Sequence, residues 1–208
     1  MAEIIYPFSL TTLARVKARL SMTTTGWDAV LIRLINAATD YIQGECCRQF
    51  LQATYTNEVH SIYGIGQRYL LLKQSPVVSI SSLQYRVGLK TNPSWTDFIA
   101  DDWELLEDGQ SGMIRIYGPI LRGTNVIRVT YLAGYLIDWA NAGDTTKHTL
   151  PADLTDFCER LVTRWFKRRE AEGKEQESFN GSTVKWKEEL TVEDKQTIAG
   201  YKRLPVFV

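Results

Sequence analysis

Few side chains in this sequence have a type and spacing suited to catalysis. Its two histidines, His60 and His148, do not lie at metal-ligand spacing from a cysteine or a carboxylate. We therefore expect both to be ordinary strand or surface residues. The adjacent Cys46 and Cys47 have no histidine near them in the sequence that would activate a thiol nucleophile. We interpret both cysteines as core residues.

The glycine-containing and acidic motifs also fall short of the sites they partly match. Gly64-Ile65-Gly66 lacks the third glycine of the dinucleotide-binding fingerprint and predicts a hairpin turn. Gly109-Gln110-Ser111-Gly112 is one residue short of a nucleophile elbow. Asp101, Asp102 and Glu104 lack the spacing of a calcium loop, so we expect a solvated loop leading into a strand. The sequence predicts no enzyme, no metal site and no cofactor. A small hydrolase with a site assembled from distant residues is the remaining enzymatic alternative.

One basic run, Arg164 to Arg169, could contact nucleic acid by neutralising phosphates without reading bases. The same charges suit the C-terminal end of a helix. Lys plus Arg and Asp plus Glu both number 24, so the net charge is zero and disfavours a DNA-binding regulator. The candidate residues for weak, non-specific contact with DNA are Arg164, Lys167, Arg168 and Arg169.

The strongest structural signal is a helix predicted over residues 25–50. Thr25 and Asp28 are three residues apart, which predicts a capping box at its start. Its apolar stripe, at the i, i+3, i+4, i+7 spacing of one helix face, consists of Leu31, Leu34, Ile35, Ala38, Tyr41, Ile42 and Cys46. The polar residues expected on the opposite face are Arg33, Asn36, Asp40 and Gln43.

A shorter helix is predicted before it, over residues 9–20, with Thr11 as its cap. The polar connection between the two helices is short, which predicts that they lie side by side as a helical hairpin.

From Leu51 the sequence changes to β-branched and aromatic residues that alternate with period two. Turn residues bound these runs. We predict strands over residues 53–62, 67–73, 78–87, 102–107, 112–117 and 124–132. Short successive strands with tight turns predict an antiparallel arrangement, as a small sandwich or barrel.

A second long helix is predicted after Pro151, over residues 152–170, with an apolar stripe that should pack on the helix of residues 25–50. Residues 170–183 are polar and predict a flexible or extended linker. Beyond the linker, a short strand at 184–186 and a short helix capped by Thr191 lead into an apolar tail that needs a partner. The candidate partner-binding residues are Trp186, Ile198, Tyr201, Lys202, Arg203, Leu204 and Phe207.

Composition is that of a globular protein, with 44% hydrophobic and 23% charged residues. Three cysteines, two of them adjacent, make a poor disulfide framework and favour a reducing compartment such as a cytoplasm. No stretch approaches the ~18 to 20 apolar residues of a membrane span. We expect an α+β protein with helices in 1–50, an inserted antiparallel β module in 51–133, a connection and long helix in 134–170, and a linker and interaction tail in 171–208.

Four segments together resemble the head-to-tail connector proteins of long-tailed bacteriophages, also called adaptor or head-completion proteins, in the longer variety with a β insertion. The segments are LTTLARVKARL, GWDAVLIRLINAATDYIQGECCRQF, LPADLTDFCERLVTRWFKRRE and TIAGYKRLPVF. The family's usual charged loop between the first two helices is replaced here by threonines.

The resemblance implies a virion structural protein, made in the host cytoplasm, that forms a ring of roughly twelve subunits below the portal. Such a ring joins head to tail and extends the DNA channel. The implied partners are the portal protein, neighbouring copies of the chain and a stopper or tail-completion protein, with no membrane. A tail-completion or stopper protein of the phage neck is the alternative within virion assembly.

Overall fold

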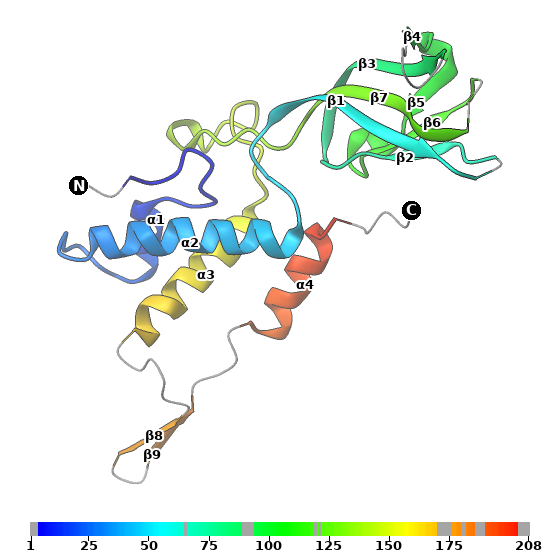
Figure 1. Cartoon of the computed structure of the whole chain (residues 1–208). Coiled ribbons are helices and arrows are strands. Elements are labelled where there is room, and N and C mark those ends of the chain that lie inside the picture. Colours follow the sequence, from blue (N-terminus) through cyan, green and yellow to red (C-terminus); the bar gives the residue numbers. More distant parts are fainter. Residues whose placement is uncertain are drawn as a thin grey trace. The chain divides into compact units, whose positions relative to one another are not determined.

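This computed structural model describes residues 4–64, 66–88, 94–118, 120, 122–169, 176–179, 182–185 and 190–203. The chain divides into two compact units. A helical unit comprises Met1–Cys47 and Ile137–Lys202, and a β unit comprises Arg48–Leu136 and Arg203–Val208. Within the described residues the fold is α+β, with α-helices and antiparallel sheets (Figure 1).

Four α-helices are described in the helical unit: α1 (Leu13–Arg19), α2 (Asp28–Cys46), α3 (Ala152–Arg168) and α4 (Val192–Tyr201). A short 3-10 helix, η3 (Trp139–Asn141), precedes α3. The prediction that α3 packs on α2 is confirmed, and α1 and α4 each contact both of these helices. The buried apolar residues that these helices share include Val16, Leu31, Ile35, Ala38, Ile42, Leu154, Phe157, Leu161, Val162 and Ile198.

The starts of α1 and α2 differ from the predicted caps. The N-cap of α2 is Trp27, whose indole has no oxygen that could accept a capping bond, and the Asp28 carboxylate accepts from Lys17 Nζ of α1 at 2.8 Å. The predicted capping box at this helix is therefore wrong. The cap of α1 is Thr12, whereas Thr11 is buried. At the start of α2, the ion pair between Lys17 and Asp28 thus takes the place of the expected hydrogen bonds between Thr25 and Asp28.

Asn36 was expected on the exposed face of α2 but is buried. Its side-chain oxygen accepts from the Tyr6 backbone N–H at 3.0 Å, and its amide nitrogen donates to the Ile4 carbonyl at 2.9 Å. The segment before α1 therefore covers this face of α2. A face that the sequence marks as polar can be buried when its polar group is satisfied in this way.

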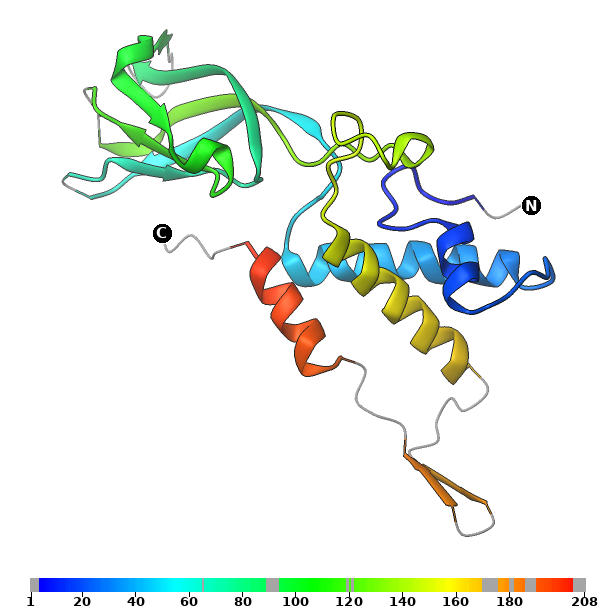
Figure 2. The same ribbon diagram turned by 180° about the vertical axis from the view of Figure 1, so that it is seen from behind.

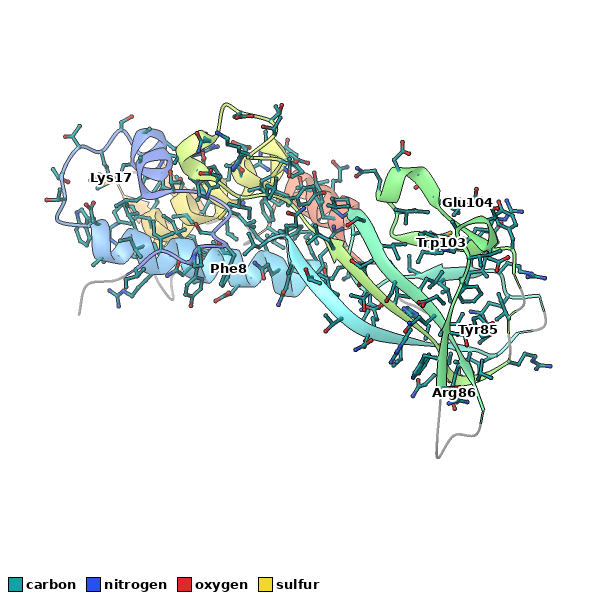
Figure 3. All side chains as sticks on the ribbon, turned by 90° about the horizontal axis from the view of Figure 1, so that it is seen from above. Phe8, Lys17, Tyr85, Arg86, Trp103 and Glu104 are labelled. Atoms are coloured by element: carbon teal, nitrogen blue, oxygen red, sulfur yellow. The ribbon has the colours of Figure 1, made fainter. Side chains whose placement is uncertain are left out.

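The β unit contains two described sheets with a shared apolar core. One has the order β1-β7-β3-β4 and the other β2-β6-β5, and all pairs are antiparallel. Tyr85 of β3 and Trp103 of β5 pack against the core from the two sheets (Figure 3). The strands are β1 (Ala53–Ile62), β2 (Tyr69–Leu71), β3 (Val77–Val87), β4 (Ser94–Asp97), β5 (Trp103–Leu105), β6 (Met113–Ile116) and β7 (Gly123–Ala133).

The six predicted strands all occur, although β2 and β5 are shorter than expected. β4 was not predicted, because a four-residue edge strand with the sequence Ser-Trp-Thr-Asp carries almost no alternation to detect. Two 3-10 helices flank β5, η1 (Ala100–Asp102) and η2 (Leu106–Gly109). Gly109 ends η2 at a φ of +82°, and a Cβ there would overlap the Val77 carbonyl oxygen, so only glycine fits.

Residues 176–185 contain a hairpin rather than the predicted linker. β8 (Gln176–Phe179) and β9 (Ser182–Lys185) pair antiparallel (Figure 2). The strand expected at 184–186 is thus part of a longer strand, with Trp186 outside the described residues. Polar composition misled the prediction, because backbone pairing in a hairpin needs few apolar residues.

Candidate interaction site

Charge pairs join α3 to α1 across the helical unit. Glu159 of α3 is 7% exposed and accepts from Thr11 Oγ1 at 3.1 Å and Arg15 Nε at 2.7 Å. Arg19 pairs with Asp156, one turn earlier on α3, at 2.6 Å. The basic side chains of α1, including Lys17 (Figure 3), are thereby committed to acidic groups of the same unit. The basic side chains of α1 therefore form ion pairs within the helical unit and do not make a patch that is free to bind DNA.

A second set of charges joins α3 to α4 around Asp194, which is fully buried. Arg164 Nη2 lies 2.5 Å from one carboxylate oxygen of Asp194, and Arg160 Nη2 lies 3.2 Å from the other. Asp194 also completes a capping box with Thr191, which confirms the predicted cap of this helix. Burial by itself would raise the pKa of Asp194, but donation from the Thr191 N–H and pairing with Arg164 outweigh it. The pKa is therefore lowered.

The four basic residues proposed to contact DNA have different surroundings. Arg164 is bound to Asp194, as described above. The Arg169 guanidinium carbon lies 4.4 Å from the centre of the Trp27 ring and 4.0 Å from that of Phe166, in cation–π contacts. Lys167 is exposed and Arg168 is half-buried. Of these four residues, Lys167 and Arg168 show no side-chain hydrogen bond or ion pair to the described part of the chain, so they are the members of the run that can reach a ligand.

The candidate partner-binding residues divide in a similar way. Ile198 is 7% exposed inside the helical unit, and its carbonyl accepts from Cys46 Sγ at 3.9 Å. The Tyr201 hydroxyl donates to the Asp153 carboxylate at 2.8 Å. Lys202 is exposed and Arg203 is half-buried. The remaining candidates, Trp186, Leu204 and Phe207, lie outside the described residues. Ile198 is a residue of the helical core, so we do not retain it as a partner contact.

The β unit holds a buried polar cluster that the sequence did not indicate. Glu58 is 8% exposed and accepts from the Tyr131 hydroxyl at 2.7 Å and from the Lys73 N–H at 2.9 Å. His60 Nε2 lies 3.0 Å from the same carboxylate. Burial would raise the pKa of Glu58, but the adjacent His60 imidazole and the hydrogen bonds from the Tyr131 hydroxyl and the Lys73 backbone N–H outweigh it, so the pKa is lowered.

A bulge in β1 explains why this cluster was missed. Asn57 has a φ of +54°, and the pairing with β7 shifts between Tyr55 and Glu58. One extra residue moves every later side chain to the other sheet face, so Glu58 points inward and Val59 is 42% exposed. The only signal in the sequence is Asn57, since asparagine tolerates a positive φ.

The described residues offer little that could carry out a reaction. They contain no group of three or more His, Cys, Asp or Glu residues that could hold a metal ion. Burial raises the pKa of the Cys158 thiol to about 12 and leaves it a poor nucleophile. Cys46 is buried as predicted, whereas Cys47 is exposed, because it ends α2 in a left-handed conformation. No helix in the described part of the chain is long and apolar enough to cross a bilayer.

A sequence model of the head completion protein family matches residues 9–198. The chain belongs to this family. The predicted resemblance to head-completion proteins is therefore confirmed, and this head completion protein is a virion structural protein of the head-to-tail neck. The match spans both units, from the start of α1 to most of α4, so it includes the charge pairs that hold α1 and α4 on α3.

Solved structures share the fold of this head completion protein. One is a chain from the "Neck of empty GTA particle computed with C6 symmetry", at a TM-score of 0.55 and 17% identity, with 99% of this chain and 96% of that chain covered. Another comes from the "Virion of native gene transfer agent (GTA) particle", at a TM-score of 0.53 and 17% identity, covering 100% and 96%. No curated protein matches the sequence.

Proposed function

We propose that this head completion protein forms a ring below the portal, where it joins the head to the tail and extends the DNA channel. The family match over residues 9–198 carries the proposal, because it covers nearly the whole described chain. The similar chain from a gene transfer agent neck, computed with C6 symmetry, supports it. A multiple of six subunits suits such symmetry, and we propose about twelve.

A closed ring requires each subunit to present two different faces to its neighbours. In our proposal the helical core forms the wall of the ring, with residues 1–50 as a helical hairpin completed by the long helix of 134–170. The β module of 51–133 supplies the lateral or outer surface. The protein acts through shape and surface chemistry and not as an enzyme, which accords with the structural role of its family.

The end of the chain, from Tyr201 onward, is proposed to bind the portal or a neighbouring subunit. Lys202 and Arg203 supply charge there, and Leu204 and Phe207 supply apolar surface. Removal of residues 202–208 tests this assignment cleanly, since α4 with Asp194 and Ile198 is kept. We expect a folded chain with normal circular dichroism that no longer binds portal in a pull-down. Full retention of portal binding and ring formation would exclude the assignment.

Lys167 and Arg168 are proposed to contact DNA weakly in the channel. Two cations contribute a small, salt-sensitive attraction without sequence preference. The variant with Lys167→Ala and Arg168→Ala should elute from a DNA column at lower salt than wild type. A control variant with Lys73→Ala and Lys147→Ala, which loses the same charge elsewhere, should elute with wild type. Equal shifts of both variants would assign retention to net charge alone.

The proposed function is tested by the mass of the purified chain in solution, measured by light scattering alone and with portal protein. A ring, or a monomer that moves into the portal peak, supports the proposal. A chain that does not bind portal but binds the tail tube would instead identify a stopper or tail-completion protein. A monomer that binds neither portal nor tail tube would overturn a role in the neck.

A further inference from the structure

The three-stranded sheet of the β unit has an outer face that points away from the apolar core. The row of paired positions that faces the core consists of Leu70, Ile114 and Leu105. Tyr69, Arg115 and Glu104 form the adjacent row across β2, β6 and β5. They lie on the opposite face, because side chains alternate along a strand. Tyr69 is 50% exposed, and the side chains of Arg115 and Glu104 are 44% and 43% exposed.

Arg115 is held at the centre of this outer face by two aromatic rings. Its guanidinium carbon lies 5.9 Å from the centre of the Tyr69 ring and 4.8 Å from that of Tyr117. Arg115 Nη1 also lies 3.8 Å from Glu104 Oε1, and the Tyr117 hydroxyl donates to the same carboxylate. Exposed tyrosines around an arginine that is already fixed are typical of the residues that dominate binding between proteins, since little side-chain freedom remains to be lost.

The four-stranded sheet has a second outer face with a different chemistry. One row of paired positions crosses all four strands and consists of Val59, Arg128, Gln84 and Asp97. The Arg128 guanidinium carbon lies 4.5 Å from the centre of the Trp95 ring, and Trp95 is paired with Arg86. Ile127, in the row next to Arg128, is buried in the core, which confirms that the arginine row faces outward. Two arginines and one aspartate give this face a net positive charge.

The two outer faces lie on opposite sides of the β unit, because the inner faces of both sheets pack on one core. Figure 3 shows Glu104 of the first face and Arg86 of the second well apart on this unit. The charge around the first face is negative. Its edge strand β5 and the 3-10 helices at the two ends of β5, residues 100–109, contain five acidic residues and no basic one.

We propose that the outer face of the three-stranded sheet of one copy docks on the outer face of the four-stranded sheet of the next copy. The inference rests on the proposed ring. A ring of identical subunits needs two different faces that fit each other. The β unit has such a pair, with negative charge around one face and positive charge on the other. The acidic residues around the first face would repel DNA phosphates, whereas the matching surface is present on the chain itself.

The first experiment places the photo-crosslinking residue p-benzoylphenylalanine at position 69 of the full-length chain. After assembly with portal and irradiation, adducts are identified by mass spectrometry. We expect adducts between two copies, in which the attached peptide comes from β3, β4 or β7. Adducts with portal alone, adducts between copies at other elements, or the absence of any intermolecular adduct would each overturn the proposal.

Charge reversal tests whether the two faces meet. Asp101→Lys with Glu107→Lys makes the surroundings of the first face basic, and Arg86→Glu with Arg128→Glu makes the second face acidic. Each double variant brings like charges together, so we expect each to need about tenfold more protein for ring formation. The chain with all four changes should assemble as wild type, because the reversed charges again attract. Failure of this combination to recover, with normal circular dichroism, would overturn the pairing of the faces.

A control combination separates this pairing from an effect of net charge. It joins the changes at Arg86 and Arg128 to Asp40→Lys and Glu193→Lys, which replace two exposed carboxylates of the helical unit. Its net charge equals that of the recovered chain, but the reversed face has no complement, so assembly should stay impaired. Equal recovery of both combinations would show that net charge alone is responsible and would overturn the proposal.

The outcomes also separate this inference from the proposed function. A wild-type chain that stays monomeric with and without portal overturns the ring and the contact between β units together. A wild-type ring that yields no adduct between copies at position 69, and that forms equally well from both charge-reversed double variants, leaves the ring intact and overturns the contact between β units alone.

Discussion

Asp194→Asn should destabilise the helical unit by removing the buried anion between α3 and α4. Loss of one partner from a buried ion pair costs about 3 to 5 kcal/mol when the remaining charge stays buried. Here the partners Arg160 and Arg164 are 30% and 27% exposed, and both can recover water when the carboxylate is lost. We therefore expect a lower value, a decrease of about 2 kcal/mol in the free energy of unfolding.

Asp194→Ala should cost more than the amide variant. An asparagine side chain keeps an oxygen that can accept from the Thr191 N–H, now 2.9 Å from the carboxylate, whereas alanine keeps none. Loss of this acceptor adds about 1 kcal/mol, so we expect a total decrease of about 3 kcal/mol, although the Thr191 hydroxyl still accepts from the backbone N–H of residue 194. The difference between the two variants thus separates the contribution of the bond from the Thr191 N–H from that of the charge.

The measurement is urea unfolding followed by far-ultraviolet circular dichroism, at neutral pH and again in acid. The pKa of Asp194 is lowered in the folded state, so its charge stabilises the fold above the unfolded pKa of about 3.9. This stabilisation is lost as the pH falls through the folded value. The gap between wild type and Asp194→Asn should therefore be full above about pH 4 and shrink below it.

Asp40→Asn is the control, because Asp40 is an exposed carboxylate on α2. This change should alter the free energy of unfolding by less than about 0.5 kcal/mol. If Asp194→Asn behaves like the control, or if its effect does not diminish in acid, the charge pairs are not what holds α4 in place.

Three further predictions concern other parts of the chain. Tyr131→Phe removes a hydroxyl that donates to buried Glu58 and should lower the free energy of unfolding of the β unit by about 1 to 3 kcal/mol, measured in urea; an unchanged value would show that water replaces the hydroxyl. Gly109→Ala should cost about 2 kcal/mol or more, because of its positive φ and the Val77 carbonyl. Gly143→Ala, in open space, is its control and should be close to neutral. Cys47 should react quickly with a thiol reagent in the native protein while the two buried cysteines react only after unfolding; fast reaction of all three would contradict the described core.

The sequence predicted the elements that depend on short-range patterns. The stripes of α2 and α3 and the alternation of β1, β3 and β7 specify one apolar face each, and the structure contains all five elements close to the predicted bounds. Periodicity is sufficient to predict these helices and strands because it indicates which residues share a face, whatever that face contacts in the folded protein.

Only the tertiary structure decided which partner each polar group has. Glu159 accepts from Thr11, 148 residues away. Arg164, one of the predicted DNA contacts, instead pairs with Asp194, 30 residues away. A single bulge at Asn57 buried Glu58 and exposed Val59. Such outcomes depend on which distant groups the fold brings together and on one-residue changes of register, and local sequence patterns contain neither.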